Sequence, residues 1–199
     1  MFTGDWGYSV AVQKDYPVWI LIMERIPRTI EILAISIIIA TYLGIKAGKI
    51  AAHNRKKFWD VIIRFMIYLG MTVPGFIIAQ WLMTIFFSTG IRIFPVGNYK
   101  TAGIGDPPTI TYSRLIDSLI SGKIYIFLDY ISYIFLPIIV MVLVELVLIA
   151  RKMRSTMIET LQEDYVLYAR AKGLKEKTVL NKYALRNSYL TIIAHISLV

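Results

Sequence analysis

Cysteine is absent from this 199-residue sequence, histidine occurs only twice, and charged residues make up 18% of it. Without cysteine the chain can form neither disulfides nor thiolate metal sites. His53 and His195 lie far apart and lack the spacing of a ligand pair, so we expect no metal site. The sequence also has no glycine-rich phosphate loop and no evident pair of nucleophile and base. We therefore predict that the chain needs no cofactor and is not an enzyme.

Hydrophobic residues, by contrast, make up 57% of the sequence, and they gather in long runs. Three runs, at about 29–47, 61–87 and 128–150, each reach the roughly 20 residues that a helix needs to cross a membrane. A partial run begins at about 189 and continues to Val199. A buried helix of a soluble protein is the alternative for any one run, but three together favour a membrane. The predicted fold class is all-α, a polytopic bundle of membrane helices.

The net charge of +9 comes from basic residues that lie between these runs. Nucleic-acid binding would need them on one soluble face with aromatic residues among them, so we expect a lipid bilayer as partner and no nucleic acid. Basic residues are frequent in 48–60 and in 151–188, and scarcer in 88–127. The positive-inside rule then predicts that the first two stretches are cytoplasmic, and that 88–127 and the N-terminal stretch 1–28 are extracytoplasmic.

The two ends of the sequence predict that it is a piece of a larger bundle. Residues 1–28 show no signal-peptide pattern although they are expected outside, so a membrane helix is expected before Met1. The apolar run that reaches Val199 predicts further helix beyond it. Within 88–127, a short amphipathic helix is expected to end near Gly122.

Small residues and prolines inside the runs predict how the helices pack. Pro74 and Pro137 should kink their helices, because proline lacks the N–H that a helix interior needs. Glycine lets two helices approach closely. Four glycines are expected to act in this way: Gly44, Gly48, Gly70 and Gly75.

Within the cytoplasmic loop 151–188, residues 155–188 have the pattern of a helix, a tight turn and a second helix. Thr156 and Glu159 have the spacing of a capping box, which predicts that the first helix starts there. Gly173 fits the left-handed residue that follows a helix, and Leu174 would then fold back in a Schellman motif. The stretch therefore predicts a helical hairpin.

Chemistry alone leaves two roles open for this hairpin. A basic amphipathic hairpin can lie on the membrane interface. Alternatively, the small residues Ala169, Ala171 and Gly173 would let another protein approach closely, while Arg170 and Lys172 supply charge. Either role requires the hairpin to be exposed at the surface of this chain.

The same residues carry a resemblance to a known family. Residues 164–174 read D-Y-V-L-Y-A-R-A-K-G-L, and residues 184–187 read A-L-R-N. This pattern resembles the cytoplasmic EAA loop in permeases of ATP-binding-cassette importers, in particular the first permease subunit of dipeptide and oligopeptide importers. Stretches 4–9 and 24–33 resemble that family too, so the resemblance covers nearly the whole chain. Thr191 departs from it, since a proline is common at that place.

The resemblance implies a multi-pass permease subunit in the cell membrane that forms a path for peptides or related solutes. It implies three kinds of partner: cytoplasmic ATPase subunits that hydrolyse the ATP, a second permease subunit in a heterodimer, and an extracytoplasmic substrate-binding protein. The fold would be an incomplete type I importer transmembrane domain, spanning 29–199. A group of loop residues would couple it to the ATPase: Asp164, Tyr165, Ala169, Arg170, Ala171, Lys172, Gly173 and Leu174.

Two charged residues fall inside the apolar runs. Arg64 and Glu145 are functional candidates because burying a charge unpaired in a membrane is costly. Both could instead snorkel to the interface or form an ion pair with each other, and we favour a structural role. Two other functions stay open: a membrane scaffold whose hairpin recruits a partner other than an ATPase, and an intramembrane enzyme using these two residues.

Overall fold

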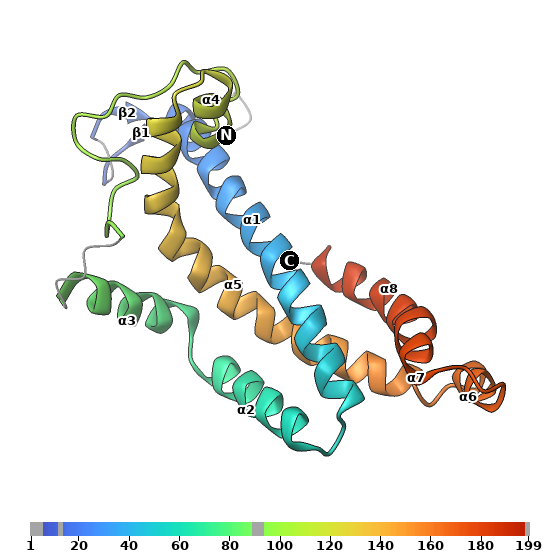
Figure 1. The fold of residues 1–199 in the computed structure, drawn as a ribbon. Helices are drawn as coiled ribbons and strands as arrows, with labels where there is room; N and C mark the ends of the chain where they lie inside the picture. The colour runs from blue at the N-terminus through green and yellow to red at the C-terminus, as the bar shows by residue number, and fades with distance from the viewer. Residues whose placement is uncertain (1–5, 12–13, 89–93, 198–199) are drawn as a thin grey trace. The chain divides into compact units, whose positions relative to one another are not determined.

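The computed structural model describes residues 6–11, 14–88 and 94–197. Most of them are helical, which confirms the predicted all-α class (Figure 1). Two short strands, β1 (Tyr8–Ser9) and β2 (Tyr16–Pro17), pair antiparallel ahead of the first helix. The helical elements are α1 (Val18–His53), α2 (Phe58–Thr72), α3 (Gly75–Ser88), α4 (Arg114–Ile120), α5 (Ile124–Thr160), α6 (Asp164–Ala171), α7 (Glu176–Thr178), the π-helix η1 (Val179–Ala184) and α8 (Leu185–Ile196).

Within the described residues, two helices are long and apolar enough to cross a membrane. These are α1, with 36 residues, and α5, with 37 residues. The helix α1 extends beyond both ends of the predicted run 29–47, and it already includes residues 18–28 of the N-terminal stretch. Pro27 and Pro137 lie inside α1 and α5, and each helix continues past its proline.

The predicted run 61–87 is not one helix. It is divided between α2 and α3, which are bent by 94° at the break and together could count as a third, broken span. Val73 at the break is extended, with φ −92° and ψ 116°. Proline disfavours helical backbone in the residue before it, and it removes a donor from the helix. Pro74 therefore causes a break here rather than the expected kink.

The chain divides into two compact units. The first unit comprises residues 1–35 and 82–138, and the second comprises 36–81 and 139–199. Within the second unit, glycines stand where helices approach most closely. A Cβ atom on Gly48 would lie 2.6 Å from Cβ of Met153, and one on Gly70 would lie 2.6 Å from Val147 Cγ2. These contacts agree with the close packing predicted for the glycines.

The first unit is built around the segment that precedes α5. Ser113 caps the start of α4, because its Oγ accepts a hydrogen bond of 3.0 Å from the N–H of Ile116. This helix ends at Ile120, and Gly122 follows with a positive φ of 67°. The expected short helix ending near Gly122 is therefore present.

Candidate functional site

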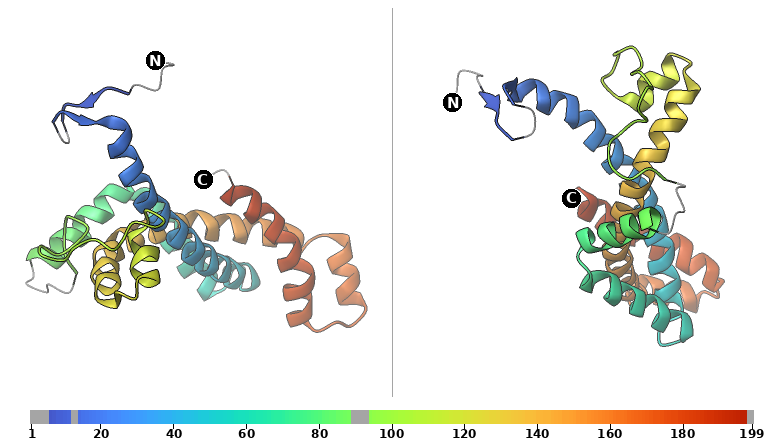
Figure 2. Two further views of the ribbon diagram at one scale, coloured as in Figure 1. Left: turned by 90° about the horizontal axis from the view of Figure 1, so that it is seen from above. Right: turned by 90° about the vertical axis from the view of Figure 1, so that its left-hand side faces the viewer.

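The helical hairpin (residues 164–188) is formed by α6 and by the helix that runs on through α7, η1 and α8. Figure 2 shows α6 lying beside that helix, and their facing side chains form a small core. Val166 and Val179 are completely buried in this core, with Leu161 and Tyr183 packed against it. The hairpin therefore has an interior of its own.

The turn of the hairpin is a Schellman motif, as predicted. The N–H of Leu174 donates to the carbonyl of Ala169 at 3.3 Å, and the N–H of Gly173 donates to the carbonyl of Arg170 at 2.9 Å. Gly173 has φ +77°, in the left-handed region where a side chain is strained. A Cβ atom there would meet nothing within 4 Å, so only backbone conformation requires glycine.

The start of the hairpin differs from the predicted capping box. Thr156 lies inside α5, which continues to Thr160, and Glu159 accepts a hydrogen bond of 3.1 Å from Ser155 instead. Met157 is completely buried beside this point. Continued helix keeps that side chain in the interior, and this packing outweighs the local signal for a helix start.

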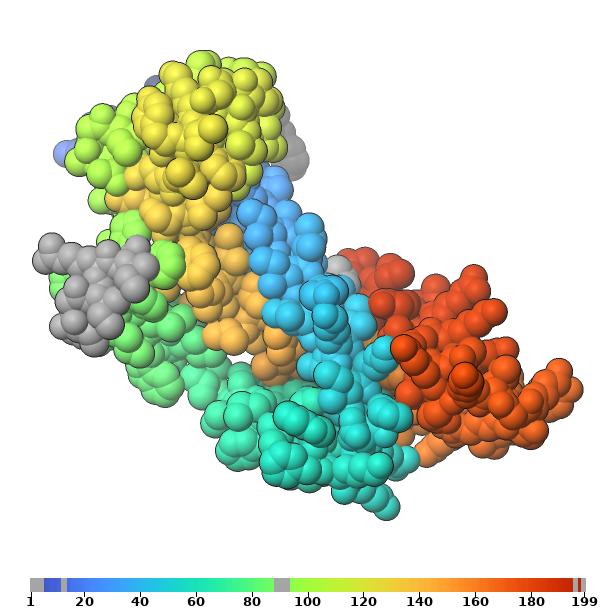
Figure 3. Space-filling model, in the orientation of Figure 1, coloured from blue at the N-terminus to red at the C-terminus, as the bar shows by residue number. Residues whose placement is uncertain are grey.

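The predicted coupling residues separate into a buried group and an exposed group. Ala169 is only 3% exposed and belongs to the hairpin core, so it offers no surface to a partner protein. Two residues that were not among the predicted ones, Tyr168 and Leu167, are 63% and 50% exposed on the opposite side. The other predicted residues are also exposed: Asp164, Tyr165, Arg170, Ala171, Lys172, Gly173 and Leu174. In Figure 3 the orange and red atoms of this segment are uncovered on the face shown.

Charge on the hairpin is partly neutralised internally. Arg170 forms two hydrogen bonds with Glu176, of 3.2 Å from Nε and 2.8 Å from Nη2. This hydrogen bonding raises the pKa of Arg170 and lowers the pKa of Glu176. Lys172 lies 4.5 Å from the ring centre of Tyr168. The exposed face thus presents aromatic and apolar side chains beside a lysine.

Polar contacts attach the hairpin to the two long helices. Lys49 of α1 donates a hydrogen bond to the side-chain oxygen of Asn181 in η1. The hydroxyls of Thr160 and Ser188 lie 3.4 Å apart, and both residues are buried. A movement of the hairpin would therefore act on α1 and on the end of α5.

A buried carboxylate lies where α2 begins. Asp60 is 1% exposed, and its two oxygens accept hydrogen bonds from Arg154 of α5, at 2.6 Å from Nε and 3.0 Å from Nη2. The backbone N–H of Lys56 donates to the same carboxylate at 2.9 Å. Sequence reasoning missed this pair because its members are 94 residues apart. The one local signal was Arg64, one helical turn after Asp60.

The possible ion pair between Arg64 and Glu145 is not formed. The Nε atom of Arg64 lies 3.6 Å from an oxygen of Asp60. Within the part of the chain that the structure describes, Glu145 has no ion-pair partner. Asp60 is the better partner for Arg64 because it lies four residues before it, on the same face of α2.

Polar side chains also organise the first unit. Glu31 accepts hydrogen bonds from the hydroxyl of Ser113 and, at 2.6 Å, from that of Tyr130. Arg114 is buried and pairs with Asp106, and its burial lowers the pKa of the guanidinium. These contacts join α1, α4 and α5 within this unit.

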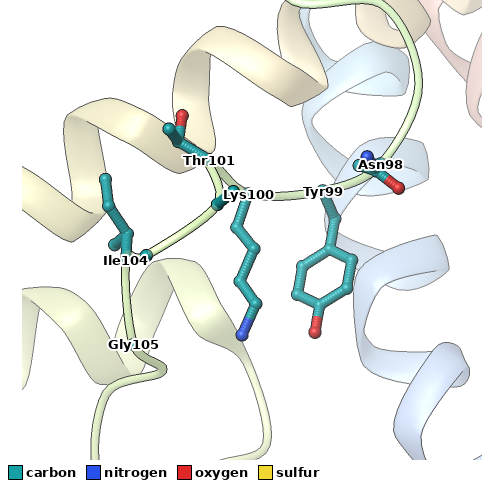
Figure 4. A pocket seen from close by; sticks show the side chains of 8 residues that line it. Asn98, Tyr99, Lys100, Thr101, Ile104 and Gly105 are labelled. Atoms are coloured by element: carbon teal, nitrogen blue, oxygen red, sulfur yellow. The ribbon is translucent and has the colours of Figure 1, made fainter.

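One surface pocket of about 470 Å³ is lined by residues 98–105 of the first unit (Figure 4). The side chains of Tyr99 and Lys100 point the same way along it, whereas Thr101 points to the other side. Thr101 donates a hydrogen bond of 2.6 Å to Asp129 of α5. The pocket therefore lies on a loop that is anchored to α5.

Metal ligation finds no support in the described ranges. They contain no group of three or more histidine, cysteine, aspartate or glutamate residues that could hold an ion. His53 lies at the end of α1, and the side chain of His195 lies outside the described residues.

Comparison with known proteins gives a consistent answer. Residues 40–199 match the family model described as "Binding-protein-dependent transport system inner membrane component". The chain is 33% identical over 193 residues to the dipeptide transport system permease protein DppB of Lactococcus lactis, covering 97% of this chain and 54% of that protein. It is 32% identical over 193 residues to the oligopeptide transport system permease protein AppB of Bacillus subtilis, covering 97% of this chain and 54% of the relative.

A third relative is the dipeptide transport system permease protein DppB of Escherichia coli K12, 33% identical over 199 residues, with 98% of this chain and 57% of that protein covered. The chain thus spans about half the length of the curated relatives it matches. The family match includes the hairpin, the buried Asp60–Arg154 pair, all of α5 and residues 40–53 of α1. The chain belongs to the family of binding-protein-dependent transport system inner membrane components.

Proposed function

We propose that this chain is part of a permease subunit of an ATP-binding-cassette importer in the cell membrane, and that it carries peptides or related solutes. The observation that carries the proposal is the helical hairpin, with its Schellman turn and exposed aromatic face, in a chain of this family. ATP hydrolysis takes place in a separate subunit, and this chain supplies part of the path and the contact to that subunit.

The orientation follows from charge. The turn between α1 and α2 and the whole of 151–188 are rich in lysine and arginine, which the positive-inside rule assigns to the cytoplasm. The stretch 88–127, which includes α4, faces outward. The hairpin therefore faces the compartment where ATP and the ATPase subunits are found. An extracytoplasmic binding protein delivers the solute, and a second permease subunit completes the path.

The hairpin is suited to docking in a groove of an ATPase subunit. Tyr165, Leu167 and Tyr168 are exposed on α6, and Leu174 extends that apolar surface beyond the turn. Aromatic side chains that become fully desolvated contribute most to protein interfaces. Ala169 supports this surface from inside the hairpin, and Lys172 adds charge beside it. The role of Ala169 is thus indirect.

The kind of solute is inferred from the relatives. Those named above are permeases of dipeptide and oligopeptide transport systems. A peptide is accordingly the first substrate to test, and the transport assay should include a free amino acid as a negative control.

Site-directed crosslinking in native membranes tests the proposal. A single cysteine replaces Lys175, in the exposed turn of the hairpin, or Gly97, which lies in the stretch expected outside. The chain has no cysteine of its own, which simplifies the labelling. We expect Lys175→Cys to capture an ATPase subunit and Gly97→Cys to capture none. Capture of a different protein, or of none, by Lys175→Cys in abundant folded protein would instead favour a scaffold.

A further inference from the structure

We propose that Asp60 and Arg154 are positioning residues for coupling, which join the hairpin-bearing end of α5 to the turn between α1 and α2. The inference rests on the proposed function, and it names the contact that passes movement of the hairpin to α2. Arg154 lies in the last two turns of α5, and α6 begins four residues after α5 ends at Thr160. Asp60 lies in the first turn of α2.

The carboxylate of Asp60 is fully engaged. Both oxygens are bound by Arg154 in a two-point contact, and one also accepts the N–H of Lys56. Such a bidentate contact fixes the angle between two groups as well as their distance. Because the contact involves the backbone of Lys56, it fixes the α1–α2 turn itself, and not only the start of α2.

The burial of this ion pair indicates that its main effect is to fix the relative orientation of α5 and the start of α2. Asp60 is 1% exposed and the Arg154 side chain is 21% exposed. A buried ion pair seldom adds net stability over apolar residues of the same size, since both charges must be removed from water. Its advantage is that only one arrangement of the partners satisfies it. A pair in this position therefore contributes alignment more than stability.

Neighbouring contacts make the end of α5 a firm support for this alignment. Met153 and Met157, on either side of Arg154, are completely buried. A Cβ atom on Gly48 of α1 would lie 2.7 Å from the carbonyl oxygen of Ala150. The end of α5 and α1 thus pack closely at Gly48, and we expect a displacement of the hairpin to move this end, α1 and the start of α2 together.

Because Arg64 also lies near Asp60, the two single substitutions of the pair should differ in their effects. Its Nε atom is buried, has no hydrogen-bond partner and lies 3.6 Å from Asp60. If Arg154 is neutralised, Arg64 still provides a positive charge for the carboxylate. If Asp60 is neutralised, two arginines lose their partner. Asp60→Asn should therefore lower the amount of folded protein more than Arg154→Gln does.

The test uses the assembled transporter in proteoliposomes, with its ATPase subunits and binding protein. Uptake of a radiolabelled peptide and ATP hydrolysis are measured together for Asp60→Asn and for Arg154→Gln. We expect solute moved per ATP hydrolysed to fall on the order of tenfold, within the usual range of coupling between sites. Arg151→Gln is the matched control. It removes the same charge from an exposed position of α5, where the arginine has a 3.5 Å contact with the sulfur of Met71 and no ion pair among the described residues.

The double variant Asp60→Asn with Arg154→Met separates positioning from stability. It leaves neither charge of the pair, so thermal stability and assembly should be higher than in Asp60→Asn alone, although Arg64 still lacks its partner. Solute moved per ATP should stay low, because the two-point contact is missing. Full recovery of that ratio in the double variant would overturn the inference. So would single variants in which uptake and hydrolysis fall only in proportion to protein abundance.

The Lys175→Cys crosslink distinguishes this inference from the proposed function. Asp60→Asn should still give the crosslink to the ATPase subunit, since the hairpin surface is unchanged. Crosslinking and normal transport stoichiometry in that variant would refute the positioning role and leave the importer function intact. Absence of the crosslink in the otherwise unaltered protein would remove the proposed function, and the positioning role with it.

Discussion

Each of the two units of this chain is stabilised internally by a different kind of interaction. In the second unit, long helices approach closely at glycines, and each helix satisfies its own backbone hydrogen bonds. In the first unit, much of the chain between α3 and α5 is irregular, and side chains have to satisfy the backbone there. Asp117 and Asp129 accept hydrogen bonds from backbone N–H groups of that segment. Close helix packing at glycines therefore stabilises the second unit, whereas aspartate side chains that accept backbone N–H groups stabilise the irregular segment of the first.

The difference predicts where substitutions act. A change of volume should matter most in the second unit, because the helices have no room between them. Loss of an acceptor should matter most in the first unit, because a buried donor without a partner is costly. Three pairs of variants, one pH dependence and one single variant would sharpen or break this contrast, from the largest expected effect to the smallest.

The largest effect is expected for Gly48→Val. The new side chain would overlap Met153 and the carbonyl oxygen of Ala150, which is backbone and cannot yield. Overpacking of this kind costs about 3 kcal/mol, enough to lower the thermal midpoint measured by size-exclusion chromatography. The matched control is Gly105→Ala in the first unit, where a Cβ atom meets nothing within 4 Å. Equal loss in both variants would contradict the contrast.

Asp117→Asn comes next. The carboxylate of Asp117 accepts hydrogen bonds from the N–H of Ile110 at 3.1 Å, the N–H of Thr111 at 2.8 Å and the hydroxyl of Thr111 at 2.7 Å. Asparagine leaves one donor poorly matched, at about 1–3 kcal/mol. Limited proteolysis of the segment ahead of α4 should become faster, with Glu163→Gln at an exposed carboxylate of the second unit as the comparison.

The same carboxylate predicts a pH dependence. Burial raises the pKa of Asp117, but the hydrogen bonds from Thr111 and from the N–H of Ile110 outweigh it, so the pKa lies below its ordinary value of 3.8. A depressed pKa stabilises the folded state above the unfolded value and loses this effect as the pH falls through the folded value. Resistance to an acid-active protease should therefore persist at pH 5 and decline progressively as the pH falls below about 4. Unchanged cleavage down to pH 3 would contradict the assignment.

Gly173→Val should change coupling more than stability. The residue has φ +77°, which a β-branched side chain adopts at a cost of about 1–3 kcal/mol. The strain would distort the turn of the hairpin while the membrane helices stay folded. Uptake should fall with little change in thermal midpoint, and Gly173→Asn, which tolerates this conformation, should retain most of the activity. Similar uptake in both variants would remove the turn from the mechanism.

The smallest effect is expected for Glu176→Gln. It breaks the pair with Arg170, whose side chain is 37% exposed while that of Glu176 is 48% exposed. Ion pairs this open to water contribute at most about 1 kcal/mol and are screened by salt. The thermal midpoint should shift slightly at low salt and hardly at all at high salt. A large, salt-independent loss would show that the pair is part of the hairpin interior.

Local signals in the sequence were enough to place the long helices and the turn at Gly173. A long apolar run and a glycine after a helix determine the structure of their own segment through interactions between residues close in sequence. Such local interactions can be recognised without the folded structure. Thr156 shows the limit, because a sound capping box lost to the burial of Met157, which only the folded chain reveals. Ala169 shows it again, since its neighbours in the sequence do not tell whether Val179 covers it.

Contacts between distant residues were out of reach for the same reason. Asp60 was visible as a charge between two apolar runs, and Arg154 as one of many basic residues after α5. Nothing in their surroundings indicated that they meet. Pro74 was predicted to kink its helix, but whether a proline bends or breaks a helix depends on the tertiary contacts on both sides of it. The helices α1 and α5 continue past Pro27 and Pro137.

The π-helix η1 has a consequence for how this region can vary. Its hydrogen bonds skip one residue more than those of an α-helix, so its turn holds a surplus residue. That surplus keeps two buried faces in phase with what they each contact: Val179 and Leu180 at the start of η1, and Ser188 and Ile192 in α8. Removing Lys182, which is exposed, would convert the turn to ordinary α-helix and leave both faces where they are. A deletion anywhere later in α8 would rotate the rest of that helix by about 100°. At the wide turn of η1, therefore, the chain can lose a residue while the rest of the helix keeps its orientation.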